Sequence, residues 1–496
     1  MFSVSLKKNT LANYLGQGWQ ALMGLVFIPL YIRYLGVEAW GLVGFMATMQ
    51  AWLLLLDMGM SPALAREMAR FTAGEISASA IQNLLRSLEI VLGVAALLAG
   101  LSAWGLASWL ADHWLKHDQL PAHTVVMAIA IMGWIVAGRI FEQLYRGALQ
   151  GLQRQVWLNA AQAFMATARW AGAAGVLAWI SSTVETFFIW QGVVSLITVA
   201  VLAFGTHRFL PSDNIKPIFS WTELQRIRRY AGGMLATSLL VLFLTQIDKL
   251  LLSTLLPLRS YGYYMLAASV AGSLGFLFSP LTSAVLPRFT ELVARNDKPA
   301  LINMYHRASQ FMALIVIPPA VTMAVFAKPL LFIWSGDVEL AVQSAPLVTL
   351  LALGTMFNAF MNIPYMLQLA HGWSGLAARI NLAAVVIFVP ALFYFIPRYG
   401  TLGAAWIWFI LNFCYVIFGV HFMYRRLLLD QKWVWYRNDV FTPLLAATVP
   451  ILIVFWLWPL SGSFAWIISG ILIAVLFSYI SSFFFIPATR EILARR

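Results

Sequence analysis

The chain has 496 residues, of which 61% are hydrophobic and 10% charged, with a mean hydropathy of +0.81. A soluble globular domain carries about 25% charged residues, so this composition excludes a soluble enzyme or a soluble binding module. The apolar runs are continuous rather than alternating, which favours membrane-spanning helices over a β-barrel. The net charge of +13 arises from basic residues in short loops, so it indicates membrane orientation and not nucleic-acid binding.

Apolar runs of about 20 residues predict an all-α polytopic membrane protein with about 14 transmembrane helices. The first run follows Lys7 and Lys8 but is too long for the apolar core of a signal peptide, so we interpret it as a retained helix. The predicted spans are residues 12–32, 39–57, 87–110, 123–147, 157–180, 186–205, 231–256, 262–287, 308–334, 343–369, 379–396, 402–423, 443–459 and 463–486.

The basic residues are distributed unevenly over the predicted loops. The N-terminus, the even-numbered loops and the C-terminal tail hold most of the 32 Lys and Arg residues. The odd-numbered loops hold only Arg33, Lys116, Arg259 and Arg398. The positive-inside rule therefore predicts that both termini are cytoplasmic. Because the predicted loops are too short for a soluble catalytic domain, we expect the protein to act within the membrane.

The linker at residues 206–230 has a helix signal of its own. Ser220 and Glu223 form a capping-box pattern before the basic residues Arg226, Arg228 and Arg229. We expect a short cytoplasmic surface helix whose basic side chains face anionic headgroups. An ordinary solvated loop is the alternative.

A short motif recurs at an offset of 221 residues. Leu35–Gly41 matches Leu256–Gly262 in its Leu, aliphatic, aromatic and Gly positions. Six predicted helices separate the copies, which predicts two parallel six-helix lobes that can enclose a central cavity; chance matching of common residues is the alternative. The expected domains are an N-terminal lobe at 1–205, the linker at 206–230, a C-terminal lobe at 231–424, and two additional transmembrane helices with a basic cytoplasmic tail at 425–496.

Polar side chains inside the spans are the candidate functional residues, because charges in hydrocarbon are costly. Arg139, Glu142 and Arg146 share one face of the fourth span, and Arg169 lies in the fifth. Asp248 and Lys249 lie in the seventh. Further residues expected to line a polar lumen are Asn13, Gln17, Gln20, Gln162, Asn358 and Asn362. Such stripes are expected to face one another or a hydrated cavity.

These residue types suit an anionic substrate. A guanidinium stays protonated and grips phosphate in bidentate fashion, so Arg139, Arg146 and Arg169, with Lys249, predict a basic lumen that binds an anionic headgroup. Packing ion pairs, Arg139 with Glu142 and Asp248 with Lys249, are the alternative. Arg169 has no acid nearby on its own helix, so its counter-charge comes from another helix or from a ligand, and we favour the ligand.

Energy coupling is expected to use a gradient, the substrate's own concentration difference or a partner. Asp248 and Glu142 are the candidate proton carriers, since a low dielectric raises the proton affinity of a carboxylate. The sequence contains no phosphate-binding loop, no metal-ligand motif and no catalytic constellation. We therefore expect a transporter, not an enzyme, with no cofactor, metal or catalytic residue.

Several stretches together carry a resemblance to a known family. They include Asp57 and Gly59, then Arg66 and Glu67, and later Gln246–Lys249, Lys328–Gly336, Asn381 and Tyr399–Ala405. In this order and spacing the chain resembles the Wzx-like O-antigen and polysaccharide flippases of the multidrug/oligosaccharidyl-lipid/polysaccharide exporter superfamily.

The resemblance implies alternating access by two lobes in a bacterial cytoplasmic (inner) membrane. It implies transfer of an undecaprenyl-pyrophosphate-linked oligosaccharide repeat unit from the cytoplasmic to the periplasmic leaflet. A polysaccharide polymerase and a chain-length regulator are the partners it suggests, besides the lipid-linked substrate and the bilayer.

Three other functions remain open. The first is a lipid II flippase of the same superfamily. The second is a multidrug or cation antiporter, which would be expected to have a more acidic cavity. The third, from a different class, is a membrane-embedded polysaccharide polymerase or glycosyltransferase, which usually needs a sizeable extramembrane loop or an acidic metal-binding pair.

Overall fold

The computed structural model describes residues 2–210, 217–459 and 463–487. Helices make up almost all of these ranges, whose one isolated β-bridge pairs Lys116 with Pro257. The chain divides into two compact units, Met1–Gly262 and Tyr263–Arg496, which are described separately below. The sequence predictions for Lys216 in the linker and for Arg490, Arg495 and Arg496 in the tail lie outside the described residues.

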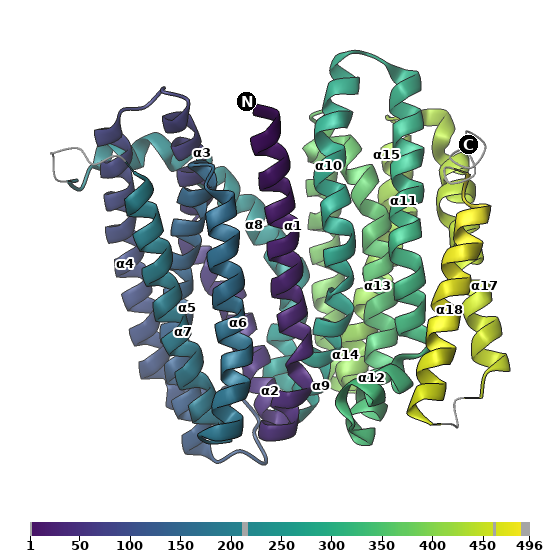
Figure 1. Ribbon diagram of the computed structural model, residues 1–496, viewed down its shortest axis with the longest axis horizontal. Helices are drawn as coiled ribbons and strands as arrows, with labels where there is room; N and C mark the ends of the chain where they lie inside the picture. The colour runs from purple at the N-terminus through teal and green to yellow at the C-terminus, as the bar shows by residue number, and fades with distance from the viewer. Residues whose placement is uncertain (1, 211–216, 460–462, 488–496) are drawn as a thin grey trace. The chain divides into compact units, whose positions relative to one another are not determined.

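The first unit is a helical bundle with α5 at its centre. Helix α5 packs against α4, α7 and α3, and α1 packs along α6 (Figure 1). The elements are α1 (Phe2–Val26), α2 (Ile28–Leu53), the 3₁₀ helix η1 (Leu54–Asp57), α3 (Met60–Thr72), α4 (Ala78–Trp109), the π-helix η2 (Leu110–Trp114), α5 (Ala122–Gly151), α6 (Gln155–Trp179), α7 (Val184–Phe209), α8 (Trp221–Leu255) and the start of α9 (Leu258–Gly272). Fully buried Leu84, Leu88, Ile140 and Leu144 join α4 to α5.

The second unit is built around α11 and α13. Helix α13 packs against α14, α11 and α10, while α17 and α18 pack on each other and on α11. The elements are α10 (Leu274–Ala294), α11 (Lys298–Val325), α12 (Ala327–Ser335), α13 (Val338–Ala370), α14 (Ser374–Cys414), the π-helix η3 (Tyr415–Gly419), α15 (Val420–Tyr424), the 3₁₀ helix η4 (Leu429–Gln431), α16 (Lys432–Val434), the π-helix η5 (Trp435–Phe441), α17 (Thr442–Leu457) and α18 (Phe464–Phe485).

Within the described ranges, 11 helices are long and apolar enough to cross a membrane, which confirms an all-α polytopic membrane protein. The count of about 14 stays a prediction. One candidate, Gly375–Tyr424, is 50 residues long because it includes the kink at Gly400 (φ 59°, ψ −140°). Gly36 (φ 84°, ψ 167°) interrupts α2 in the same way. Both glycines lie in predicted loops, at residues 397–401 and 33–38.

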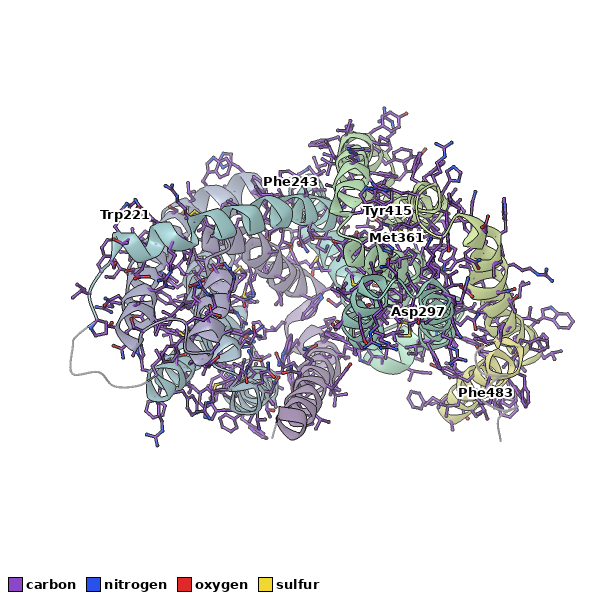
Figure 2. The ribbon with its side chains drawn as sticks, turned by 90° about the horizontal axis from the view of Figure 1, so that it is seen from above. Trp221, Phe243, Asp297, Met361, Tyr415 and Phe483 are labelled. Atoms are coloured by element: carbon purple, nitrogen blue, oxygen red, sulfur yellow. The ribbon has the colours of Figure 1, made fainter. Side chains whose placement is uncertain are left out.

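Helix α8 differs from the expected linker helix. Ser220 Oγ accepts a hydrogen bond from the Glu223 amide, as the capping box predicts, but the helix then continues unbroken to Leu255. Figure 2 shows it as one long ribbon that passes Trp221 and Phe243. The expectation that Arg226 faces headgroups is wrong, because its guanidinium contacts Glu223 and Glu67. A buried carboxylate competes successfully with a solvated lipid surface.

The two copies of the repeated motif contact each other at their glycines. A Cβ built on Gly41 would lie 2.5 Å from the Leu258 carbonyl oxygen. A Cβ on Gly262 would clash with the Val37 carbonyl oxygen. Val37 and Leu258 are themselves separated by 221 residues, so the two contacts are equivalent. Both positions therefore require glycine for close backbone approach.

Candidate functional site

Two arginines of the first unit share one buried carboxylate. Arg139 Nη1 lies 2.6 Å from Glu142 Oε2, three residues away on α5, the spacing that brings side chains together on a helix. Arg169 Nη2, from α6, lies 3.4 Å from Glu142 Oε1. The side chain of Glu142 is 6% exposed and that of Arg169 is 10% exposed. The counter-charge of Arg169 thus comes from another helix, one of the two sources expected from the sequence.

Helix α7 completes the shell around this carboxylate. Ser195 Oγ donates to Glu142 Oε1 at 3.2 Å, and Thr198 Oγ1 accepts from Arg169 Nη2 at 3.5 Å. Gly138 on α5 allows the approach, since a Cβ there would lie 3.1 Å from Ser195 Oγ. Sequence analysis missed both hydroxyl residues. Their spacing of three along an apolar helix is the signal that could have indicated them.

Arg146 lies one helical turn beyond Glu142 and has a neutral partner. With the Gln162 amide oriented so that its oxygen faces the guanidinium, that oxygen accepts from Arg146 Nη2 at 2.7 Å and from Nε at 2.6 Å. No carboxylate of the described ranges lies within salt-bridge distance of Arg146, while Glu142 neutralises only one of the other two arginines. We name Arg139, Glu142, Arg146 and Arg169 the arginine cluster; it carries two net positive charges.

The seam between α1 and α6 holds several of the predicted lumen residues. Asn159 Nδ2 donates to Asn13 Oδ1 at 2.6 Å, and Gln20 Nε2 donates to the Gly16 carbonyl at 3.2 Å. Gln17, by contrast, is exposed and has no part in these contacts. Side-chain amides thus join two helices whose polar stripes keep both off the set of candidate spans.

Asp248 and Lys249 form a second charged pair, on α8. Lys249 Nζ lies 3.6 Å from Asp248 Oδ1 and also donates to the Thr245 carbonyl. Asp248 is 9% exposed. No contact among the described residues joins this pair to the arginine cluster, so the structure does not bring Lys249 together with the arginines grouped with it in the sequence.

The residues of the family motif hold the turn between η1 and α3. The Asp57 carboxylate accepts hydrogen bonds from the Ser61 amide at 3.1 and 3.2 Å, which caps the start of α3. Met58 (φ 48°) and Gly59 (φ 73°) make the left-handed bend between the two elements. This local geometry gives Asp57 and Gly59 a positioning role in the chain turn.

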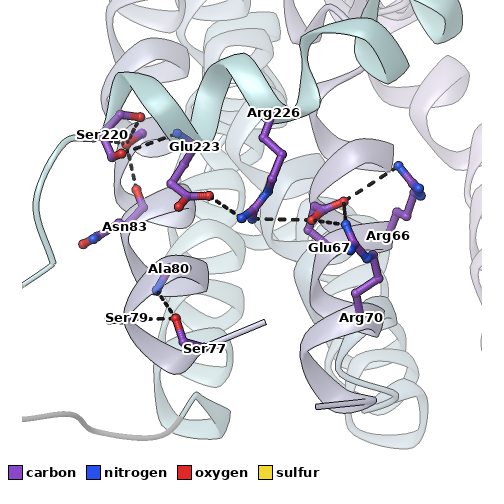
Figure 3. A network of polar contacts seen from close by, with 11 residues as sticks. Arg66, Glu67, Arg70, Ser77, Ser79, Ala80, Asn83, Ser220, Glu223 and Arg226 are labelled. Carbon is purple, nitrogen blue, oxygen red and sulfur yellow. Dashed lines mark hydrogen bonds and ion pairs between the residues drawn. The ribbon is translucent and has the colours of Figure 1, made fainter. Parts of the chain in front are cut away.

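Glu67 joins α3 to α8 through three arginines (Figure 3). The buried carboxylate lies 3.2 Å from Arg70 Nη1 and 3.4 Å from Arg226 Nη2. Arg66 Nη1 is farther, at 3.8 Å. Arg70 also bonds Glu75, and this hydrogen bond, followed by the charge of Glu67, raises the pKa of Arg70. We name Glu67 and these three arginines the α3–α8 clamp.

In the second unit, Asn358 and Asn362 line a pocket with residues of α14 and η3. Asn358 Nδ2 also donates to Asn412 Oδ1 at 2.8 Å. Sequence analysis had no place for a separate network, in which Asp439 of η5 lies 2.5 Å from His306 Nδ1 and accepts from Gln310 Nε2 at 2.7 Å. That network attaches η5 to α11, and the lone acid in an apolar run was its only signal.

The helical architecture with a charged interior defines a multi-pass membrane protein of the transporter type of fold. The lipid II flippase MurJ in an inward closed conformation superposes with a TM-score of 0.75 at 15% identity, over 98% of this chain and 99% of that chain. An inward-facing multidrug resistance MATE family transporter of the MOP superfamily gives 0.65 at 14% identity, over 83% and 95%. These likenesses establish the fold.

Sequence comparison establishes the family. The family model described as polysaccharide biosynthesis protein matches residues 6–293, more than half of the chain, and the chain belongs to this family. A relative from Shigella flexneri with the name "Putative O-antigen transporter" is 21% identical over 406 residues, which cover 82% of this chain and 94% of the relative. The resemblance drawn from the motifs is confirmed.

Proposed function

We propose that the protein is a flippase that moves an undecaprenyl-pyrophosphate-linked oligosaccharide repeat unit from the cytoplasmic to the periplasmic leaflet by alternating access. The observation that carries the proposal is the arginine cluster, with its two net positive charges among membrane-spanning helices. Uncompensated charge in hydrocarbon is costly and is rarely kept without a role. Pyrophosphate would neutralise the excess charge that the protein leaves unpaired.

Arg146 is the residue of the cluster best suited to contact pyrophosphate first. Its guanidinium donates to a neutral amide, whereas Arg139 and Arg169 share Glu142. Exchanging a neutral acceptor for phosphate oxygens gains a charge-assisted bidentate interaction. Arg139 Nε is also buried and has no hydrogen-bond partner within the described part of the chain, so the cluster retains donors for an anion.

The proposal includes the finer features predicted from the sequence. These are about 14 transmembrane helices, both termini in the cytoplasm, the domain bounds given above, an inner-membrane location, and assembly with a polymerase and a chain-length regulator. Transport is proposed to be coupled to an ion gradient, with Asp248 and Glu142 as the carriers. Glu142 suits this role less than Asp248, because two guanidiniums hold its charged form.

Two transporter alternatives remain distinct from this proposal. A lipid II flippase is supported by the MurJ-like fold, while the curated relative is named for O-antigen. A multidrug or cation antiporter agrees with the MATE-like fold, but a cluster with excess positive charge would repel a cation. A polymerase or glycosyltransferase gains no support from the family or from the fold.

The test is translocation of extracted lipid-linked oligosaccharide in proteoliposomes, scored by a sugar-binding lectin that reaches only the outer leaflet. We expect Arg146→Gln to reduce the translocation rate at least about tenfold, the loss of one charge-assisted contact. Arg398→Gln, at an exposed arginine stacked on Tyr394, is the matched control and should translocate normally. Equal rates for wild type and Arg146→Gln would refute the pyrophosphate role.

A further inference from the structure

A polar pocket in the second unit has a lining unlike that of the arginine cluster. Its volume is about 160 Å³, room for about five water molecules at ~30 Å³ each. The lining consists of Asn358, Met361, Asn362 and Tyr365 from α13, Ala377, Ile380 and Asn381 from α14, and Tyr415 from η3. Figure 2 shows Met361 beside Tyr415 at this place.

Local geometry aims the polar side chains into one space. Asn358 and Asn362 are four residues apart on α13 and Tyr365 follows three residues later, so all three lie on one helix face. Ala377 and Asn381 are likewise four apart on α14. Tyr415 begins the π-helix η3, a wide turn of the kind often found at functional sites. Its hydroxyl donates to Asn381 Oδ1 at 3.2 Å.

The three asparagines keep unused hydrogen-bonding groups. Asn358 donates to Asn412 and Asn362 donates to the Asn358 carbonyl, so each has an amide oxygen to spare. Asn381 uses its oxygen for Tyr415, so its Nδ2 remains. Within the described ranges, these two oxygens and this nitrogen have no protein partner. The pocket therefore presents both acceptors and a donor to an occupant.

We infer that this pocket binds a neutral sugar ring of the lipid-linked substrate. A sugar hydroxyl both donates and accepts, and an amide offers both functions without a charge. An anion would call for Arg or Lys in the lining and a cation for a carboxylate, and the lining has neither. The rings of Tyr365 and Tyr415 and the side chain of Met361 supply the apolar surface that ligand pockets combine with a few polar groups.

This inference rests on the proposed function and assigns the two ends of the headgroup to different chemistry. The arginine cluster takes the pyrophosphate, which is common to all lipid carriers. The amide pocket takes the variable sugar. Substrate choice would then depend on the asparagines and tyrosines of α13, α14 and η3, since a site built to bond a hydroxyl rejects an analogue that lacks it.

The experiment measures binding of two probes to the full-length protein in nanodiscs. One probe is undecaprenyl pyrophosphate without sugar, and the other is the same lipid carrying the oligosaccharide extracted from cells that make it. Asn381→Asp is the sharpest variant because it keeps the acceptor for Tyr415 and removes only the free donor. We expect Asn381→Asp and Asn362→Ala each to weaken the glycosylated probe about three- to tenfold, the effect of one hydrogen bond, with the sugar-free probe unchanged.

Control variants separate the two hypotheses. Asn303→Ala, at an exposed helical asparagine, should bind both probes normally, and Arg146→Gln should weaken both. If wild type binds the two probes equally, or if Asn381→Asp and Asn362→Ala leave the glycosylated probe unchanged, the sugar pocket is refuted and the pyrophosphate role stands. If wild type binds neither probe, the proposed function fails and the inference fails with it. Tetraphenylphosphonium binding that Asn381→Asp or Asn362→Ala weakens would instead favour a cation site and overturn the inference.

Discussion

Glu142 is the carboxylate on which the stability of the arginine cluster depends. Glu142→Gln keeps the shape of the side chain and an acceptor for Ser195 but removes the negative charge. Arg139 and Arg169, with side chains 19% and 10% exposed, would then repel each other without a counter-ion. A pair of unit charges at about 4 Å interacts by roughly 4 kcal/mol at an effective dielectric of 20. Part of this attraction only offsets desolvation.

Removing one partner from a buried ion pair typically costs about 3–5 kcal/mol. We therefore expect Glu142→Gln to lower the free energy of unfolding by about 3–5 kcal/mol, measured by denaturation of the purified protein in mixed micelles with SDS. Asp112→Asn, which removes an exposed carboxylate, is the control and should stay within about 0.5 kcal/mol of wild type. Unchanged stability of Glu142→Gln would refute the reasoning.

A second variant tests whether charge is the cause. Arg139→Gln in the Glu142→Gln background removes one of the two uncompensated guanidiniums. We expect the double variant to be more stable than Glu142→Gln alone, with a coupling energy of about 1–3 kcal/mol between the two positions. If the double variant loses the sum of the two single losses, the cluster stabilises the protein by packing and not by electrostatics.

Three further outcomes are expected. Arg169→Ala should abolish translocation while the protein still inserts, because Glu142 keeps Arg139 as a partner, and Arg169→Lys should retain part of the rate; normal surface glycan in cells with the alanine variant would contradict this. Asp248→Asn should remove any pH dependence of transport in vesicles, and an unchanged pH profile would exclude Asp248 as the proton carrier. Glu67→Gln should increase amide hydrogen exchange at the start of α8 by about tenfold or more, since Arg226 loses its buried partner; protection equal to that of wild type would show that the α3–α8 clamp does not hold α8.

Hydropathy was sufficient to predict the all-helical fold, because each membrane-spanning segment must bury its own backbone hydrogen bonds. The breaks at Gly36 and Gly400 were also predictable, since both lie where apolar runs are interrupted. The behaviour of α8 was not. Hydropathy separates the basic start of α8 from its apolar continuation, but helix continuity depends on backbone geometry, and no proline occurs between Ser220 and Leu255 to end it.

The composition of the arginine cluster was predictable and its pairing was not. Periodicity placed Arg139, Glu142 and Arg146 on one face of α5 because that relation is internal to a helix. The contact of Arg169 with Glu142 joins two helices, and a single sequence contains no measure of their relative rotation. The same limit applied to Ser195, whose hydroxyl is unremarkable in the sequence until α5 and α7 bring it to the carboxylate.

The repeated motif shows how one physical requirement appears at both levels of description. In the sequence it is a Leu, an aliphatic residue, an aromatic residue and a glycine at fixed spacing. In the structure, Gly41 meets the Leu258 backbone and Gly262 meets the Val37 backbone, and each pair differs from the other by the same 221 positions. A reciprocal contact of this kind is what two equivalent loops make when each lies against the other. Because both glycines face a carbonyl oxygen, a side chain at either one would separate the loops, and the need for contact explains why the pattern occurs twice.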